Sequence, residues 1–362
     1  MKILHERFIY VIMSKFLHSR FKTLEPYDTS EELESMNGYI RLNTNESPFA
    51  PSPLAIKYAH EAANGLNYYS DPDCRLLAEK ISVMLGVKTS EIIFGNGSDE
   101  ILNFIFMGLC ENGAAFPDMT YSFYKILANF HGVNYKLIPL KNFRISPDDY
   151  KNLQARTIFL ANPNAPTGLA LNINELEQII TSNPDSLIII DEAYIDFADS
   201  ISAIKFIHEY NNVIITRTFS KSRSLAGGRL GFCVTCEEIA KDLRDLKNTI
   251  TPYNINAMTQ AAGLGSLEDD DYYTKNINLI RSVREFTKNN LRKMGFEVTD
   301  SQTNFLFTRH ERLTGQEIFN HLKKNGIMIR YFESLPEFNR ITIGTNEQMQ
   351  KLLNCLAEII YK

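Results

Sequence analysis

Four groups of side chains that could do chemistry each follow a short apolar run in the sequence. The first group is a glycine-rich turn with two carboxylates, and the second is an Asn-Pro-Asn turn. The third is a carboxylate with a tyrosine three residues on, and the fourth is a lysine preceded by a serine. These groups are residues 95–100, 162–168, 191–194 and 219–221. A lysine nitrogen that has lost its proton can form an imine, which opens a route to covalent catalysis.

A small phosphorylated ligand would use all four groups. Backbone N–H groups at the start of a helix that opens with Ser98 favour a phosphate, and Ser220 and Arg229 would add a hydroxyl and a guanidinium. Asp191 could pair with a protonated pyridine ring, and Lys221 could bind an aldehyde. These are the requirements of pyridoxal 5′-phosphate, whose ring withdraws electrons only while its nitrogen stays protonated.

The elements that must position these groups are alternating strands and helices. Continuously apolar runs predict strands, and the segments between them have helical patterns, which together indicate a mostly parallel sheet covered on both faces. Because ligands bind at the carboxyl ends of such strands, we expect the four groups to open into one crevice. The expected strands are residues 91–94, 157–160, 187–190 and 213–216, and the expected helices are residues 98–110, 172–180 and 201–210.

After about residue 253 the pattern changes to that of a smaller α+β domain. We expect residues 1–45 to form an N-terminal arm that joins this domain, residues 46–252 to form the large domain, and residues 253–362 to form the small one. The helices expected in the small domain are residues 257–267, 270–294 and 315–325, and the strands are residues 296–299, 304–308, 327–331 and 340–343.

Composition narrows the class of protein. The 362 residues include 38 Lys and Arg against 43 Asp and Glu, and with no basic stretch this gives no support for nucleic-acid binding. Five scattered cysteines suggest a reducing compartment, so we expect a cytoplasmic protein. The apolar run at residues 8–13 is too short to cross a membrane, and we interpret residues 1–12 as an upstream start or an appended arm.

From about Leu24 to its end, the chain resembles the fold-type I pyridoxal-phosphate aminotransferases, and most closely the histidinol-phosphate aminotransferases. Each motif is weak alone, but together they follow the family's order. The motifs are residues 42–48, 69–72, 95–100, 120–121, 162–168, 191–194, 220–221, 225–232, 326–330 and 340–345. The resemblance implies an α/β fold with a mostly parallel seven-stranded sheet in the large domain and a smaller α+β domain.

The resemblance also implies a role for each matching residue. Lys221 would be the Schiff-base lysine that moves a proton between the substrate and the cofactor, Asp191 would pair with the pyridinium, and Tyr194 would hydrogen-bond the cofactor's 3′-oxygen. Tyr69 would reach the phosphate of the neighbouring subunit, so the resemblance implies a homodimer. The other residues implied to bind pyridoxal 5′-phosphate are Gly97, Ser98, Asp99, Tyr121 (stacked on the ring), Asn162, Asn164, Ser220 and Arg229.

The substrate end of the site is implied by two arginines. Arg340 and Arg330 match the family's substrate-anion arginines, and planar guanidinium groups suit a carboxylate or a phosphate alike. Asn43 and Tyr27 are expected to line the same end. The implied reaction is transamination between histidinol phosphate or imidazole-acetol phosphate and glutamate or 2-oxoglutarate, in histidine biosynthesis.

Other functions stay open at this point. Within the same subgroup, an aromatic amino-acid aminotransferase and a threonine-phosphate decarboxylase need the same cofactor. A cofactor-binding regulatory module without catalysis is a further alternative, although the stretch before Leu24 is too short for a DNA-binding headpiece. The Gly95-Asn96-Gly97 turn lacks the third glycine of a dinucleotide-binding motif, and Cys233 and Cys236 have no metal-site partners, so no metal is expected.

One position departs from the family's pattern. Many relatives have a second asparagine that hydrogen-bonds the cofactor's 3′-oxygen, and here that position is Ala165. A lost neutral hydrogen bond is worth about 0.5–1.5 kcal/mol, so we expect an altered imine pKa and not inactivity. Tyr194, Asn162 and Asn164 are the residues that could compensate.

Overall fold

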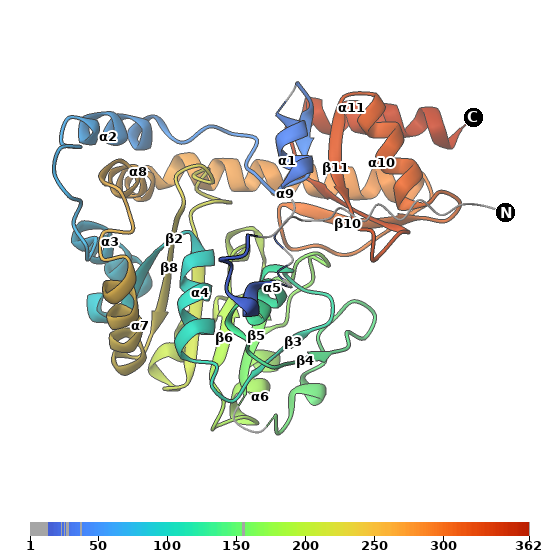
Figure 1. Cartoon of the computed structure of the whole chain (residues 1–362). Coiled ribbons are helices and arrows are strands. Elements are labelled where there is room, and N and C mark those ends of the chain that lie inside the picture. Colours follow the sequence, from blue (N-terminus) through green and yellow to red (C-terminus); the bar gives the residue numbers. More distant parts are fainter. Residues whose placement is uncertain are drawn as a thin grey trace.

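The computed structural model describes residues 14–361, apart from residues 23, 25, 27, 28, 37, 154 and 155. The interpretation of residues 1–12 and the assignment of Tyr27 therefore lie outside the described residues. Figure 1 shows a larger body built on one sheet and a smaller body built on a second sheet, with the long helix α9 (Asp270–Lys293) running along their boundary. The α/β fold class expected from the sequence is confirmed.

The larger body contains a seven-stranded sheet with the order β2-β8-β7-β6-β5-β3-β4. Every pair is parallel except those made by β8, which runs against both of its neighbours. The carboxyl ends of β2, β5, β6 and β7 therefore meet at one edge of the sheet. The strands are β2 (Ile92–Asn96), β3 (Ala114–Pro117), β4 (Tyr135–Ile138), β5 (Thr157–Ala161), β6 (Ile188–Asp191), β7 (Val213–Thr218) and β8 (Leu230–Thr235).

Side chains of the central strands alternate between two separate apolar clusters. In β6, Ile188 and Ile190 enter one cluster, and Ile189 enters the cluster on the opposite face. In β5, Leu160 and Phe159 divide in the same way. Because successive side chains of a strand point to opposite faces, a strand buried on both sides has a continuous apolar sequence. This is why the apolar runs located these strands correctly.

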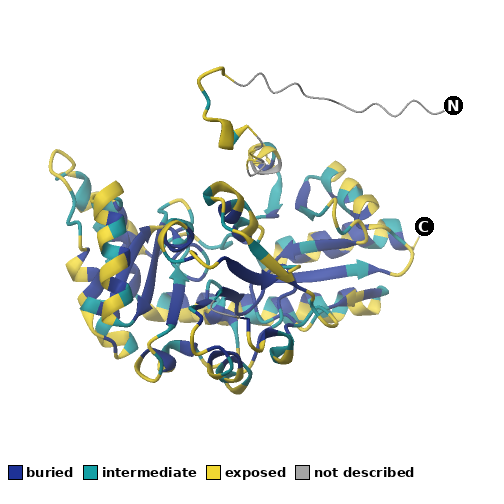
Figure 2. Ribbon diagram, turned by 60° about the horizontal axis from the view of Figure 1, so that its bottom comes forward, coloured by how far each residue is buried: buried dark blue, intermediate teal, exposed yellow. Residues whose placement is uncertain are grey.

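Helices cover both faces of this sheet, and Figure 2 shows buried strands enclosed by helices that are exposed on their outer sides. One cluster includes residues of α4, α5 and α7, and the opposite cluster includes residues of α3 and α6. Helix α8 packs along α2 beside the same body. These helices are α2 (Pro53–Ala63), α3 (Arg75–Leu85), α4 (Ser98–Gly108), α5 (Phe123–His131), α6 (Ile173–Thr181), α7 (Glu237–Ile250) and α8 (Ala257–Glu268).

The helix expected at residues 201–210 is instead a short 3₁₀ helix, η5 (Ala203–His208). The buried residues Ala203 and Phe206 are three positions apart, which matches the three-residue turn of a 3₁₀ helix. The Ala203 N–H also donates to a carboxylate oxygen of Glu192 at 2.6 Å, which holds the start of the segment. The other 3₁₀ helices are η1 (Ser19–Phe21), η2 (Thr89–Glu91), η3 (Pro147–Tyr150) and η4 (Ile195–Phe197).

The smaller body is a five-stranded sheet with the order β1-β11-β12-β10-β9. Strand β1, from the N-terminal segment, pairs in parallel with β11, and the remaining pairs are antiparallel. The apolar core beneath this sheet includes residues of α9, α10 and α11. The elements are β1 (Ile40–Leu42), β9 (Phe296–Val298), β10 (Phe305–His310), β11 (Ile327–Tyr331), β12 (Phe338–Thr342), α1 (Ser30–Ser35), α10 (Gly315–Lys324) and α11 (Asn346–Ile360).

The division at residues 45/46 and 252/253 stays a prediction. Ile255, Ala262 and Leu267, which follow the second boundary, lie in the core cluster of the larger body. None of the helices among the described residues combines the length and the apolar character that crossing a bilayer requires.

Candidate active site

Lys221 lies just beyond the carboxyl end of β7, at the edge of the sheet where the sequence placed it. Its ammonium donates to the backbone carbonyl of Thr44 at 3.1 Å, and its Nζ lies 5.9 Å from the centre of the Tyr194 ring. Thr44 follows β1 of the smaller sheet. The lysine therefore lies between the two bodies of the molecule.

Asp191 ends β6 and is 4% exposed. Its carboxylate accepts from the phenol of Tyr124 at 2.8 Å and from the backbone N–H of Ala193 at 3.2 Å. Burial raises the pKa of this carboxyl to about 6, while the hydrogen bond from Tyr124 lowers it. A cation placed beside Asp191 would stabilise its charged form.

Tyr124 was not identified from the sequence. It is fully buried in α5, and burial, together with the charge of Asp191, raises the pKa of its phenol well above the ordinary value. The phenol thus stays a hydrogen-bond donor to Asp191 at neutral pH. Its ring lies edge-on to that of Tyr121, with 5.6 Å between ring centres. The sequence signal was present but weak: a second tyrosine follows Tyr121 at helical spacing.

The turn between β2 and α4 brings charged groups together at a helix N-terminus. Arg229 donates to the carboxylate of Asp99 at 2.8 Å, and the phenol of Tyr121 donates to the other oxygen at 2.9 Å. Gly97 precedes Ser98, the first residue of α4, with a φ of +78°. A Cβ at Gly97 would lie 2.5 Å from a nitrogen of the Arg229 guanidinium, so a larger residue here would be strained by the positive φ and would displace Arg229.

Close backbone packing shapes the same turn from below. A Cβ at Gly231 of β8 would lie 2.4 Å from the backbone nitrogen of Ser98, so β8 passes directly against the start of α4. Ser220, which is 6% exposed, accepts a hydrogen bond from the Thr218 hydroxyl at 2.9 Å. The result is a cradle of backbone N–H groups with a guanidinium at its rim, which suits a phosphate.

The two asparagines of the loop after β5 have hydrogen-bond partners within the protein, Asn162 in its own loop and Asn164 also in the segment after β3. Asn162 exchanges hydrogen bonds with the backbone of Leu171, at 2.7 and 3.2 Å. Asn164 donates to the Met119 carbonyl and accepts from the Thr120 hydroxyl. Ala165 is buried and offers only a methyl group. Neither asparagine therefore replaces the missing side-chain donor in this arrangement, and their contact with a cofactor stays a prediction.

Tyr194 follows β6 and receives a hydrogen bond from outside the larger body. The side-chain nitrogen of Asn45 donates to its phenol oxygen at 2.9 Å. The ring packs edge-on against Phe305, with 5.2 Å between ring centres. Asn45 was not identified from the sequence, because its segment is separated from Tyr194 by 149 positions.

Arg330 and Arg340 are directly opposed in the register of β11 and β12. Opposed residues of an antiparallel pair share one face, and like charges at such positions repel unless an anion lies near them. A terminal nitrogen of Arg340 donates to the Asn43 carbonyl at 2.8 Å. Asn43 is 1% exposed, and neither polar atom of its side chain has a hydrogen-bond partner among the described residues.

Tyr69 lies at the surface of the protein. It is 84% exposed and stacks on Tyr253, with 4.5 Å between ring centres. Its segment is held in place by hydrogen bonds from Lys247 to the Pro72 carbonyl and from Ser70 to the Ile255 carbonyl.

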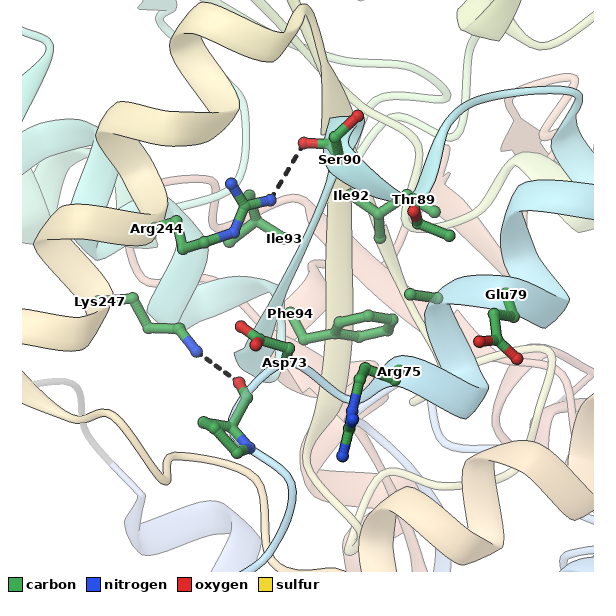
Figure 3. A pocket seen from close by; sticks show the side chains of 12 residues that line it. Asp73, Arg75, Glu79, Thr89, Ser90, Ile92, Ile93, Phe94, Arg244 and Lys247 are labelled. Atoms are coloured by element: carbon green, nitrogen blue, oxygen red, sulfur yellow. Dashed lines mark hydrogen bonds between the residues drawn. The ribbon is translucent and has the colours of Figure 1, made fainter.

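Two cavities border the larger sheet. One, of about 410 Å³, lies between the two bodies and is lined by residues that include Arg41, Ser220 and Gly344. A second, of about 390 Å³, lies along the edge strand β2, and Figure 3 shows Arg244 and Lys247 on one of its sides. Both of these cations donate to backbone carbonyls, which indicates that they support the nearby loops.

Cys233 and Cys236 are separated by the end of β8. Cys233 is buried within the strand, and Cys236 precedes α7. Within the described part of the chain, no group of three or more His, Cys, Asp or Glu residues is placed to hold a metal ion.

Comparisons with known proteins identify the family of this chain. Residues 37–356 match the family described as aminotransferase class I and II. The chain is 42% identical to a histidinol-phosphate aminotransferase of Brachyspira hyodysenteriae and 40% identical to one of Clostridium acetobutylicum, over 96% of this chain and 99% and 100% of the relatives. A structure of the Sinorhizobium meliloti histidinol-phosphate aminotransferase in complex with pyridoxal-5′-phosphate superimposes with a TM-score of 0.88, at 25% identity, covering 97% of this chain and 99% of that one.

Proposed function

The chain belongs to the class I and II aminotransferases, and from this premise we propose that it transfers an amino group between histidinol phosphate and 2-oxoglutarate, in histidine biosynthesis. The products would be imidazole-acetol phosphate and glutamate. This reaction needs one pocket that accepts a phosphate in one half-reaction and a carboxylate in the other, next to a group that reacts with the substrate's amine.

The observation that carries the proposal is the pair of hydrogen bonds accepted by the adjacent residues Asn43 and Thr44. The Thr44 carbonyl accepts from the Lys221 ammonium, and the Asn43 carbonyl accepts from the Arg340 guanidinium. The Lys221 amine of the larger body and the Arg340 guanidinium of the smaller sheet thus donate to the carbonyls of two adjacent residues. A substrate with an amino group at one end and an anion at the other would fit between them.

The residues fit pyridoxal 5′-phosphate on three points. Asp191 is a buried carboxylate whose pKa is raised by burial, and a protonated ring nitrogen beside it would stabilise its charged form. Gly97 and Gly231 leave a cradle at the start of α4 that any Cβ would obstruct, with Arg229 at its rim. The Asn43 side chain has no hydrogen-bond partner among the described residues, and Asn43 precedes Thr44, whose carbonyl accepts from Lys221. When bound, this cofactor supplies the electron sink that amino-group transfer requires.

This chain's own residues would divide the remaining work. Lys221 would hold the cofactor covalently and then move the proton at the substrate's α-carbon. Asp191, oriented by Tyr124, would keep the ring nitrogen protonated. Tyr121 would lie over the ring face, since its phenol is fixed by Asp99.

Arg330 and Arg340 would bind the substrate's anionic end. Their opposed positions put two guanidinium groups on one face of the small sheet, where both could donate to the same carboxylate or phosphate. Arginine suits both anions because its planar donors form paired hydrogen bonds with either.

A homodimer is part of the proposal. The exposure of Tyr69 and the hydrogen bonds that fix its segment support a position from which it reaches the phosphate cradle of a second copy. The cytoplasm is proposed as the compartment, since all five cysteines, each within the described residues, are free of disulfides.

Covalent labelling tests the role of Lys221. Borohydride treatment of cofactor-loaded protein, followed by peptide mapping, is expected to place the label on Lys221. Lys221→Ala is expected to abolish transamination and to retain the cofactor without the covalent bond. A label on a different lysine, or wild-type turnover in Lys221→Ala, would contradict the proposal.

Substrate preference is tested separately by kcat/KM for histidinol phosphate, phenylalanine and threonine phosphate. We expect histidinol phosphate to be preferred, and Arg330→Met to lower its kcat/KM far more than that of phenylalanine, because a phosphate carries more negative charge than the single carboxylate of phenylalanine. Equal preference for phenylalanine would favour an aromatic aminotransferase. Release of CO₂ from threonine phosphate would favour the decarboxylase.

A further inference from the structure

Resting on the proposed function, we propose that Asn45 is a positioning residue that fixes the Tyr194 phenol as a hydrogen-bond donor toward the cofactor's 3′-oxygen. Asn45 would thereby help the Tyr194 phenol compensate for the side-chain donor that is absent at Ala165. The proposal starts from one contact, the 2.9 Å hydrogen bond from the Asn45 side-chain nitrogen to the Tyr194 oxygen.

The Asn45 side chain is held in one orientation by its surroundings. It is 1% exposed, and its backbone N–H donates to the Thr342 hydroxyl at 3.0 Å. That hydroxyl in turn donates its own proton to the Asn45 side-chain oxygen at 3.1 Å. Asn304 donates to the Asn45 backbone carbonyl at 3.0 Å. With its oxygen engaged by Thr342, the amide must present its nitrogen to Tyr194.

The direction of this bond determines where the phenol's proton goes. An amide nitrogen donates and does not accept, so the Tyr194 oxygen must be the acceptor from Asn45. The phenol's own proton is then left for a different acceptor. Accepting a hydrogen bond also polarises the phenol and strengthens it as a donor. Asn45 thus selects one of the two roles that a tyrosine hydroxyl can take.

The asparagine side chains of the loop after β5 already have hydrogen-bond partners within the protein. Ala165 has only a methyl group, and Asn162 is engaged with the Leu171 backbone. Asn164 directs its nitrogen to the Met119 carbonyl and the Thr167 hydroxyl. Tyr194 is therefore the donor on which the 3′-oxygen would depend, and the orientation of Tyr194 depends on Asn45.

The contact also joins the phenol to the substrate side of the site. Thr342, which orients Asn45, lies two positions after Arg340 on β12, so both side chains belong to the same face of that strand. Strand β12, which carries Arg340 for the substrate's anion, would therefore also orient the Tyr194 phenol through Thr342 and Asn45.

The test is a pH titration of the visible absorbance of cofactor-loaded protein without substrate. A donor at the 3′-oxygen stabilises negative charge there and lowers the midpoint pH of the absorbance change. Asn45→Ala is expected to raise the midpoint by roughly half to one pH unit, the equivalent of one neutral hydrogen bond. Asn45→Asp is expected to raise it at least as much as Tyr194→Phe, because the new carboxylate accepts the phenol's proton.

A double mutant separates positioning from general damage. In a Tyr194→Phe background, Asn45→Ala is expected to cause no further shift, because no phenol is left to orient. Asn339→Ala is the matched control: this buried asparagine on β12 donates to the Gly315 carbonyl, so its loss is expected to lower stability and leave the midpoint unchanged.

Two results would overturn the role of Asn45: an unchanged midpoint in both Asn45 variants, or an equal shift in the Tyr194→Phe background. Either would leave the proposed function intact if wild-type protein still shows a visible band and transaminates. Absence of that band in wild-type protein mixed with pyridoxal 5′-phosphate would instead overturn the proposed function and this inference with it. The affinity for the cofactor, measured in the same samples, gives a second readout that does not depend on turnover.

Discussion

At the scale of single residues, the buried carboxyl of Asp191 makes the stability of the cofactor-free protein depend on pH. Burial raises the pKa of its carboxyl from 3.8 to about 6, so the folded protein binds this proton more tightly than the unfolded chain does. The contribution of Asp191 to stability is therefore most favourable below about pH 4 and is lost as the pH rises through about 6. The shift corresponds to about 3 kcal/mol.

Asp191→Asn is accordingly expected to stabilise the cofactor-free protein at neutral pH. The gain relative to wild type should reach up to about 3 kcal/mol near pH 7.5 and be much smaller near pH 4.5, because the wild-type carboxyl is protonated there. Urea unfolding at the two pH values measures this difference. The same variant should bind the cofactor more weakly. An equal difference at both pH values would mean that the charge of Asp191 carries no such cost.

At the scale of elements, the turn that opens α4 depends on glycine for two separable reasons. Gly97 has a positive φ, and a Cβ there would also contact the Arg229 guanidinium. Gly97→Ala is expected to cost about 1–2 kcal/mol of stability and to weaken cofactor binding at least tenfold, because Arg229 must move from the cradle. Calorimetric binding of pyridoxal 5′-phosphate to the cofactor-free variant measures the second effect.

Gly86→Ala is the matched control for that experiment. Gly86 ends α3 with a φ of +68°, but a Cβ there would meet nothing within 4 Å. It should lose a similar amount of stability with an unchanged affinity for the cofactor. Equal affinity in Gly97→Ala would show that the position of Arg229 does not matter for binding.

The ends of β6 and β7 are tied together by a buried ion pair beside the site. Glu192, whose side chain is fully buried, accepts from Arg217 at 2.8 and 3.0 Å and from the Ser202 hydroxyl at 2.7 Å. Glu192→Gln is expected to destabilise the protein by about 3 kcal/mol, because it leaves the Arg217 charge poorly compensated. Glu237→Gln, which removes half of an exposed pair with Lys88, should leave stability nearly unchanged in the same unfolding assay, because solvent screens the pair.

The elements also show what the sequence could and could not predict. The ends of β2, β5, β6 and β7 were predictable because strands buried on both faces are continuously apolar, and the groups that follow them are therefore brought to one edge. The partners of those groups were not predictable in this way. Tyr124 meets Asp191 across 67 positions, and Asn45 meets Tyr194 across 149, so no local pattern encodes either contact.

At the scale of the whole molecule, the exposed position of Tyr69 makes two chains the expected functional unit. In the proposed homodimer, each complete site would combine Lys221 of one chain with Tyr69 of the other, since Tyr69 is exposed at the surface and is held there by stacking on Tyr253. An incomplete site in one variant could then be repaired by a chain carrying a different defect.

Mixing two inactive variants tests this arrangement directly. Lys221→Ala lacks the lysine, and Tyr69→Ala, assayed at a cofactor concentration too low to fill its weakened site, lacks the phosphate contact. If the chains dissociate and reassociate at random, half of the dimers contain one of each, and one of their two sites has both wild-type residues. Activity should therefore rise to about a quarter of the wild-type value per chain. If Tyr69 acts within its own chain, no mixed dimer contains a complete site, and the mixture would be no more active than the average of the separate variants.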